Sequence, residues 1–532
     1  MLYTGKDIGR YYVADNVGVS DNNTTNYKTQ LNGRLQYETT IAQNHNIGAM
    51  FVYSEEYWHT RSTGASRNDR IHPSTSEINS ALTNVQSNSG SSASEGLRSY
   101  IGRMNYSAYD KYLLEFSFRV DGSSKFIKGH QYGFFPTVAV GWRFTEEEFL
   151  KKYLSSWLSS GKLRASWGKL GDNSGVGRFE QLETLTAMNY MSSDVVKGFV
   201  NKKMINKDLS WEVSTDINVG LDLGFLNNRL RTEIDFYNRL RTGMNRPSQM
   251  SIHLTGAYSA PRANIGDLLN RGLELNLTWK DKIGNVEYSV NLNGAYNRTV
   301  LKEWNEFLSR GWVYLDMPYH FLYVYENNGI AQTWQDIYNN TPQGLSPGDV
   351  IRKDLNGDGI IDGKDKKAYP NIQRDRPTTT YGITLQAAWK GFDISMLFNG
   401  GLGRKDFWLT DFNNTAFADR RYASTWDHWT EPWSLENRGG EWPRLGTSTD
   451  RSDNSYWLYN MNYLRMKNIM LGYNLPKKLL SKISMTNLRI YASAENLFTV
   501  TQYPGLDPEK KNSARDLYPI NRSFSIGLNV SF

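Results

Sequence analysis

The chain has 532 residues, of which 61 are Lys or Arg and 54 are Asp or Glu, and it contains no Cys. The charged residues are interleaved without a basic tract, which argues against nucleic acid as a partner, and the lack of Cys removes disulfides and thiolate chemistry. No apolar run reaches the roughly 18 residues of a membrane-spanning helix, which excludes a helical membrane protein but not transmembrane strands, because only alternate residues of such strands meet lipid.

The strongest pattern along the chain is an alternation of apolar and polar residues, which predicts β-strands with one apolar and one polar face. Near the C-terminus, for example, Phe524, Ile526 and Leu528 alternate with Ser525 and Gly527. Several such segments have ten or more residues, and this length matches the ~9–11 residues that a tilted strand needs to cross a bilayer. We count about fifteen, in chain order 26–38, 44–56, 98–108, 111–121, 133–145, 161–170, 213–223, 228–240, 273–279, 288–297, 377–390, 391–402, 455–474, 486–500 and 523–532.

The connections between these segments are of two kinds. Some are tight, and others are long and polar, at residues 57–97, 171–208, 241–265, 301–376 and 403–454. Short and long connections largely alternate, which predicts one rim of short turns and one rim of long extracellular loops. The sequence therefore predicts an all-β fold, a transmembrane antiparallel β-barrel. The alternative is a soluble all-β protein, a propeller or stacked sandwiches, whose strands also alternate.

Residues 354–365, DLNGDGIIDGKD, form the clearest candidate metal site. The ligand positions of an EF-hand type of calcium loop would be filled by Asp354, Asn356, Asp358, Ile360, Asp362 and Asp365, with Ile360 using its backbone carbonyl. Asp365 stands where EF-hands prefer a bidentate Glu. We expect a structural Ca²⁺ that orders a long external loop. The alternative is an Asx-rich turn without an ion.

Several motifs of common catalytic sites are missing from the sequence. The His residues are scattered and form no HExxH pair, and we find no Walker loop or GxGxxG. Three consecutive carboxylates, Glu146–Glu148, fit a solvated turn better than a glycosidase pair. We therefore expect no catalytic residues and no enzymatic activity.

The predicted external loops are rich in aromatic residues. Their rings could grip sugars or peptide side chains at a rim, or pack the loops together, or lie in the bilayer interface, and packing is the commoner role for any one residue. The aromatic residues are Trp312, Tyr314, Tyr319, Tyr323, Tyr325, Trp334, Trp408, Trp426, Trp429, Trp433 and Trp442.

Several stretches together resemble the SusC/RagA group of TonB-dependent outer-membrane transporters. They include SYIGRMNYSAYDKYLLEFSFRVDGSSKF (99–126), PGDVIRKDLNGDGIIDGKD (347–365) and LRIYASAENLFTVTQYPGLDPE (488–509), and they follow one another in the family's order to the C-terminus. The resemblance implies a barrel of 22 strands, preceded by a signal peptide and a plug domain. We expect residues 1–532 to form the C-terminal part of such a barrel without the plug, as a fragment or one piece of a split transporter with open edges.

The resemblance also implies a function: an outer-membrane nutrient importer for oligosaccharides or peptides, energised by TonB through the plug and covered by a SusD-like surface lipoprotein. Outer-membrane lipid would surround the barrel, and no nucleic acid would be involved. The alternative is a soluble or secreted β-rich carbohydrate-active enzyme.

Overall fold

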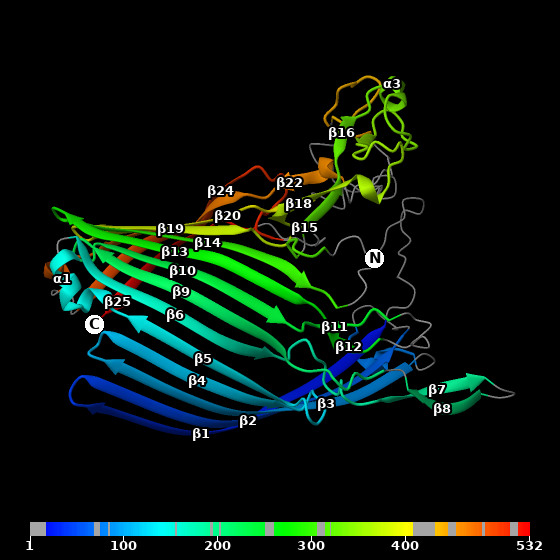
Figure 1. Cartoon of the computed structure of the whole chain (residues 1–532). Coiled ribbons are helices and arrows are strands. Elements are labelled where there is room, and N and C mark those ends of the chain that lie inside the picture. Colours follow the sequence, from blue (N-terminus) through cyan, green and yellow to red (C-terminus); the bar gives the residue numbers. More distant parts are fainter. Residues whose placement is uncertain are drawn as a thin grey trace.

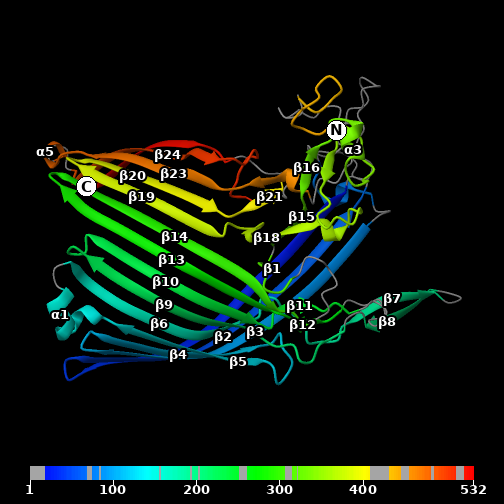
Figure 2. The same cartoon turned by 45° about the horizontal axis from the view of Figure 1, so that its top comes forward.

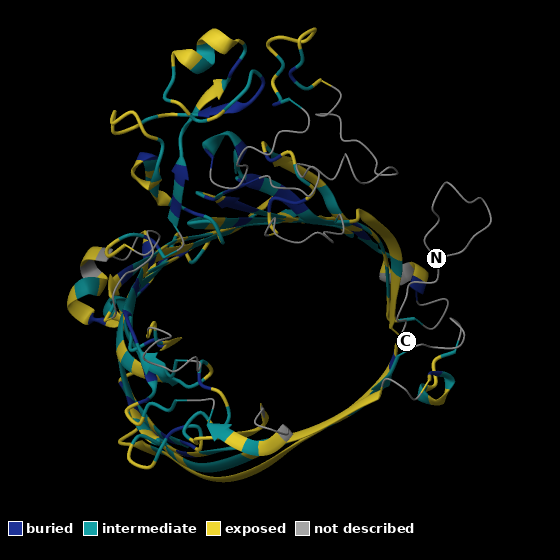
Figure 3. Cartoon of the chain, turned by 90° about the vertical axis from the view of Figure 1, so that its right-hand side faces the viewer, coloured by how far each residue is buried: buried dark blue, intermediate teal, exposed yellow. Residues whose placement is uncertain are grey.

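The computed structural model describes residues 18–68, 75–82, 86–154, 157–191, 195–201, 204–250, 260–305, 314–319, 321–407, 431–444, 454–480, 485–510 and 520–531. Within these ranges, no helix is both long and apolar enough to cross a membrane. One large sheet dominates the described residues, and it curves into a ring around an open interior (Figures 1 and 3).

Fifteen strands of the described residues form this sheet, and each is antiparallel to its neighbours. The prediction of an antiparallel all-β fold is confirmed, and every predicted strand has a counterpart. In order across the sheet they are β1 (Val19–Ile41), β2 (His45–Arg67), β3 (Gln86–Ala108), β4 (Tyr112–Ser123), β5 (Tyr132–Trp142), β6 (Leu158–Asp172), β9 (Glu212–Phe225), β10 (Leu230–Thr242), β13 (Asp267–Ile283), β14 (Val286–Glu303), β19 (Thr379–Trp389), β20 (Phe392–Leu402), β23 (Tyr463–Asn474), β24 (Asn487–Thr501) and β25 (Ser523–Ser531).

The two faces of the sheet differ in polarity because the side chains alternate along each strand. On β4, Leu114 and Phe116 lie on one face and are exposed, while Glu115 and Ser117 lie on the other. The same apolar face continues to both ends of the sheet, where Leu35 is 74% exposed and Ile526 is 84% exposed. Apolar side chains in such numbers on an uncovered surface need a non-aqueous neighbour, which a bilayer supplies.

The tight hairpin turns lie at one end of the ring, and the longest connections lie at the other (Figure 1). Tight hairpins join β1 to β2, β3 to β4 and β9 to β10, and each contains non-glycine residues at positive φ, such as Tyr109 and Asp110 at 54°. Such angles give the turn a twist that matches the strands. The helices α1 (Glu148–Leu154) and α5 (Lys477–Leu480) lie at this short-turn end (Figure 2).

The prediction of a loop at residues 57–97 is wrong over much of that range. The strands β2 and β3 pair along 23 residues, from His45↔Ala108 to Arg67↔Gln86, so only residues 68–85 connect them. The outer halves of these strands are rich in Ser, Thr and Gly. Because 23 residues exceed what a bilayer requires, neither face of the outer half needs to be apolar, and the period-two pattern is lost.

Residues 455–474, predicted as one strand, divide into three elements. A 3₁₀ turn, η6 (Ser455–Trp457), and a short strand, β22 (Leu458–Asn460), precede β23. At the two ends of the sheet, β1 and β25 each pair with one neighbouring strand among the described residues.

The long connections fold into secondary structure of their own. The largest unit, here called the outer module, comprises residues 321–376, 403–407, 431–444 and 454–460, around a core of Leu322, Val324, Phe407 and Trp457. It contains β15 (Phe321–Tyr325), β16 (Asn327–Ile330), α3 (Trp334–Tyr338), β17 (Val350–Arg352), η3 (Gly363–Asp365), β18 (Lys366–Gln373), β21 (Lys405–Phe407), η6 and β22. Elsewhere lie η1 (Ile78–Ser80), η2 (Phe144–Glu146), the pair β7 (Leu185–Met191) and β8 (Val195–Asn201), and the pair β11 (Asn245–Pro247) and β12 (Arg262–Asn264).

Candidate functional site

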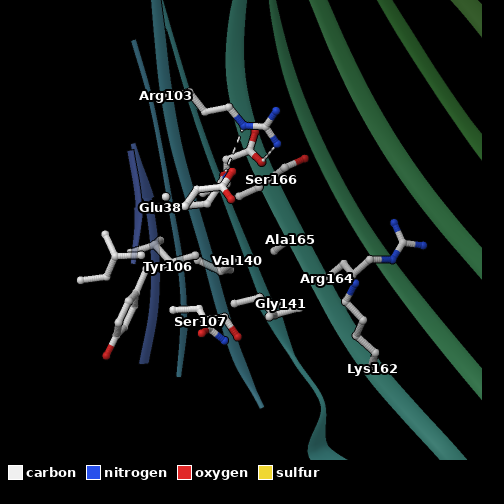
Figure 4. A pocket seen from close by; sticks show the side chains of 18 of the residues that line it. Glu38, Arg103, Tyr106, Ser107, Val140, Gly141, Lys162, Arg164, Ala165 and Ser166 are labelled. Carbon is white, nitrogen blue, oxygen red and sulfur yellow. Dashed lines mark hydrogen bonds and ion pairs between the residues drawn. The ribbon is translucent and has the colours of Figure 1, made fainter. Parts of the chain in front are cut away.

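The polar face of the sheet forms the inner wall of the ring, and one end of this wall is a charged pocket of about 830 Å³. Residues from β1 to β6 and from β9 line it, and they include the polar-face residues Arg103 and Arg164 (Figure 4). Arg103 donates to Glu115 across β3 and β4 at 2.6 Å. Lys162 and Glu38 lie in the same pocket.

Arg164 links three strands of the inner wall. Its guanidinium donates to Asp222 on β9 at 2.7 Å and to Asp235 on β10 at 2.9 Å. A Cβ at Gly220 would lie 2.5 Å from the Asp235 carboxylate and 2.7 Å from the guanidinium, so only glycine leaves room for this bridge. Gly272 is similar, since a Cβ there would lie 2.2 Å from the Tyr237 hydroxyl. Glycines thus let long polar side chains lie flat against the wall.

Further around the ring the inner wall carries a network of amide side chains beside charged ones such as Glu233. Asn291 on β14 donates to Asn276 on β13 at 2.7 Å and accepts from Asn293 at 3.4 Å. Asn297 donates to Asn270 at 2.8 Å. Such side chains offer both donors and acceptors without a net charge. The wall therefore has a charged sector and a sector rich in amides.

At the long-loop end, two buried arginines fix the segment that follows β24. Arg404 donates to the backbone carbonyls of Pro508, Glu509 and Lys510 at 3.0–3.2 Å. Arg465 donates to Asp507 and to Glu509, each at 2.7 Å. We call Arg404, Arg465, Asp507 and Glu509 the rim clamp, and it holds residues 503–510 against the rim.

Burial in the rim clamp perturbs its ionisable groups. It lowers the pKa of the Arg404 guanidinium, an effect that the nearby Asp406 opposes. Burial also raises the pKa of the adjacent Tyr503 phenol above its usual range. No motif in the sequence points to this cluster, because the carbonyl partners of Arg404 lie about a hundred residues away in the chain.

The predicted calcium loop lies in the outer module, and its carboxylates fold back on its own backbone. Asp354 accepts from the N–H groups of Gly357 at 2.7 Å and Gly359 at 2.9 Å. Asp365 is fully buried and accepts from Leu355 and Asp362 at 2.9 and 2.8 Å. The backbone hydrogen bond from Asp362 is the largest cause that lowers the pKa of the Asp365 carboxyl, and the other backbone hydrogen bonds add to it. The Asp354 side chain also interacts with Asp365.

The other predicted ligands have local partners as well. Asn356 accepts from the N–H of Asp358, Asp358 accepts from Ile360, and Asp362 accepts from Lys364, at 2.8–2.9 Å. Among the described residues, no group of three or more His, Asp or Glu side chains is arranged to hold a metal ion. The six residues thus belong to one compact loop whose carboxylates point mainly at backbone amides.

The aromatic residues of the long connections divide into packed and exposed ones. Trp433 is buried and Trp442 packs against the core of the outer module. The cations of Arg352 and Lys366 lie 4.4 and 4.9 Å from the ring centroid of Tyr325. Burial, with a contribution from Tyr314, raises the pKa of Tyr323 to about 12.

Two of the remaining aromatic residues differ in their surroundings. One contacts another connection, and the other is exposed. The Tyr319 hydroxyl accepts from Arg246 at 3.1 Å, and Trp334 on α3 is 55% exposed. Trp312, Trp408, Trp426 and Trp429 lie outside the described residues.

Comparison with known proteins matches the chain to TonB-dependent receptors. The family model "TonB dependent receptor-like, beta-barrel" matches residues 2–344. "TonB-dependent receptor P3" of Formosa agariphila is 30% identical over 476 residues, covering 82% of this chain and 45% of the relative. "TonB-dependent receptor SusC" of Bacteroides thetaiotaomicron is 30% identical over 456 residues, covering 82% and 44%.

A solved structure shows the same fold. The "RagAB peptide transporter" aligns with a TM-score of 0.80 at 23% identity, over 96% of this chain and 56% of that one. The chain thus spans about half the length of the relatives it matches. The resemblance to SusC/RagA transporters is confirmed.

Proposed function

Because the chain belongs to the TonB-dependent receptor β-barrel family, we propose that it is the barrel portion of an outer-membrane importer for oligosaccharides or peptides. Its location in the outer membrane follows from the family. The observation that carries the proposal is the pairing of an exposed apolar outer face with a polar inner wall on the same strands. Such a wall separates lipid from a hydrated path.

The proposal includes two partners. A SusD-like surface lipoprotein would lie over the long-loop end, where the outer module offers a folded surface, and the TonB complex would supply energy through a plug held inside the ring. One relative is named SusC, and one similar structure is titled a peptide transporter. The charged sector of the inner wall would suit contacts with a plug, because its ion pairs could exchange partners.

We further propose that the chain has no catalytic activity of its own. The family is one of receptors, and the inner wall is built from ion pairs and amide networks on rigid strands. The competing proposal, a soluble carbohydrate-active enzyme, would need an apolar face that is covered by protein.

Cell fractionation and uptake test the importer directly. We expect the protein in the outer-membrane fraction, and we expect its deletion to abolish growth on the oligosaccharide or peptide mixture that the wild-type cells import through it. A matched strain deleted for an unrelated outer-membrane barrel controls for general leakage. A soluble product that hydrolyses glycans would contradict the importer and support the enzyme.

We also propose that residues 354–365 bind a structural Ca²⁺. The type and spacing of the side chains fit hard-oxygen coordination, and the Asp354 and Asp365 side chains interact with each other. Each oxygen that accepts an N–H keeps a second lone pair for a metal. The ammonium of Lys364 lies 3.9 Å from the Asp358 carboxylate and would compete with the ion. We therefore expect the loop to bind Ca²⁺ with millimolar affinity.

Calcium should protect this loop from hydrogen exchange. We expect added Ca²⁺ to slow exchange of the amides in residues 350–370, and Asp354→Asn with Asp358→Asn to remove that effect, because both changes take charge from the ligand set. Asp208→Asn, an exposed turn residue in another connection, is the control. Equal exchange with and without millimolar Ca²⁺ in the wild-type protein would show that the loop is an Asx-rich turn.

A further inference from the structure

Two aromatic side chains stand exposed on the short helix α3 of the outer module. Trp334 is 55% exposed and Tyr338 is 77% exposed, and as residues i and i+4 they lie on the same side of the helix. Their ring centroids are 6.5 Å apart and their planes differ by 33°. The two exposed rings therefore lie close together on one side of the helix.

The backbone that carries these rings is held firmly despite its five residues. Thr333 and Asp336 form a capping box, and the Asp336 carboxylate also accepts from Gln332 at 2.9 Å. The backbone N–H of Thr333, as the largest cause, lowers the pKa of Asp336. Before the helix, Ala331 is fully buried and exchanges backbone hydrogen bonds with Gly348 and Asp349. Rings fixed on such a support lose little conformational entropy when they bind a ligand.

The exposed side chains of residues 327–340 carry amide, hydroxyl and aromatic groups, and none of them is charged. Gln335 donates to Asn339 at 2.8 Å, and Asn328 donates to Asn340 at 2.9 Å. The exposed side chains, here called the α3 patch, are Asn328, Thr333, Trp334, Gln335, Tyr338 and Asn339. The one charged residue of the helix, Asp336, is turned back to cap it. This surface matches an uncharged partner that offers hydroxyl groups.

The position of α3 excludes the commonest other role of exposed Trp and Tyr. In membrane proteins these residues gather at the bilayer interface, but α3 lies at the end of the outer module that is farther from the sheet with its lipid-facing side chains (Figure 1). The rings therefore lie away from the bilayer interface.

We propose that the α3 patch binds an uncharged oligosaccharide. The apolar C–H faces of sugar rings would lie on Trp334 and Tyr338, whose ring faces carry partial negative charge, and the amides would exchange hydrogen bonds with the hydroxyl groups. The inference deepens the proposed importer function and rests on it: of the two cargo classes, it selects glycans for the first contact at the cell surface.

Isothermal titration of the purified protein in detergent tests the proposal, with maltoheptaose, cellohexaose, laminarihexaose, mannohexaose and a tryptic peptide mixture as probes. We expect at least one glycan to bind, and the double variant Trp334→Ala with Tyr338→Ala to weaken it by roughly tenfold or more. Trp334→Phe with Tyr338→Phe should retain most of the affinity, because both rings remain. Phe199→Ala, an exposed aromatic on β8, should change nothing.

Three results would overturn the proposal: no binding of any of the four glycans, equal glycan affinity in the double alanine variant, or loss of peptide binding in place of glycan binding. Hydrogen exchange across residues 327–340 checks that the helix remains in each variant. The importer proposal is tested separately, by fractionation and uptake. If it failed there, the glycan affinities measured by titration would still stand.

Discussion

Replacing Arg465 by alanine is expected to release residues 503–510 from the rim. The side chains of Arg465 and Asp507 are only 3% and 2% exposed, so the substitution leaves a buried carboxylate without its cation. Removing one member of a buried pair typically costs about 3–5 kcal/mol. Hydrogen exchange followed by mass spectrometry should show strongly accelerated exchange in this segment, while exchange in β4 stays unchanged.

Two further variants separate the buried charge from general damage. Arg465→Met together with Asp507→Leu removes both charges, so much of the protection should return, because no unpaired carboxylate remains. Arg103→Ala breaks an ion pair whose side chains are 45% and 37% exposed, and such pairs contribute about 0–1 kcal/mol. If Arg465→Ala exchanged like Arg103→Ala, the rim clamp would have no structural role.

Phe116→Arg should prevent the barrel from assembling in a membrane. Phe116 lies near the middle of β4 on the apolar outer face and is 41% exposed. An arginine near the bilayer midplane on the lipid face costs about 2–4 kcal/mol, and the folding of a strand into this sheet depends on its neighbours on both sides. We expect loss of the folded, heat-modifiable band in electrophoresis and recovery of the protein in aggregates.

The neighbouring residue provides the matched control. Ser117 is one position along the same strand and lies on the polar inner wall, so Ser117→Arg adds the same side chain to a hydrated surface. That variant should assemble normally. Equal failure of both variants, or normal assembly of Phe116→Arg, would contradict the assignment of the two faces.

The sheet was predictable from sequence because one physical rule acts along every strand. A wall between lipid and water must alternate, so residues such as Leu114, Glu115 and Phe116 reveal both the strand and its faces without any knowledge of distant partners. The rule fails where the environment becomes uniform. In the outer halves of β2 and β3 both faces tolerate polar residues, so the strand residues 57–67 and 86–97 show no alternation that would predict them.

The candidate sites were less predictable, since they depend on contacts between distant parts of the chain. Arg404 meets its carbonyl partners 104–106 residues later, and no local pattern encodes that meeting. The need for glycine at a position such as Gly220 becomes evident only in the folded sheet, where the side chains of Arg164 and Asp235 lie over it. The aromatic residues could be counted from the sequence, but only the fold separates the packed Trp442 from the exposed Trp334.

The central claim is that alternate residues of these strands face lipid, and a nitroxide scan of β4 tests it most directly. Since the chain has no Cys, each position from Leu113 to Asp121 can be changed singly to Cys, labelled, and reconstituted in liposomes. We predict that oxygen reaches the labels at Leu114, Phe116, Phe118 and Val120, and that a water-soluble nickel chelate reaches those at Glu115, Ser117 and Arg119. Accessibility without a period of two, or with the two sets exchanged, would contradict the account.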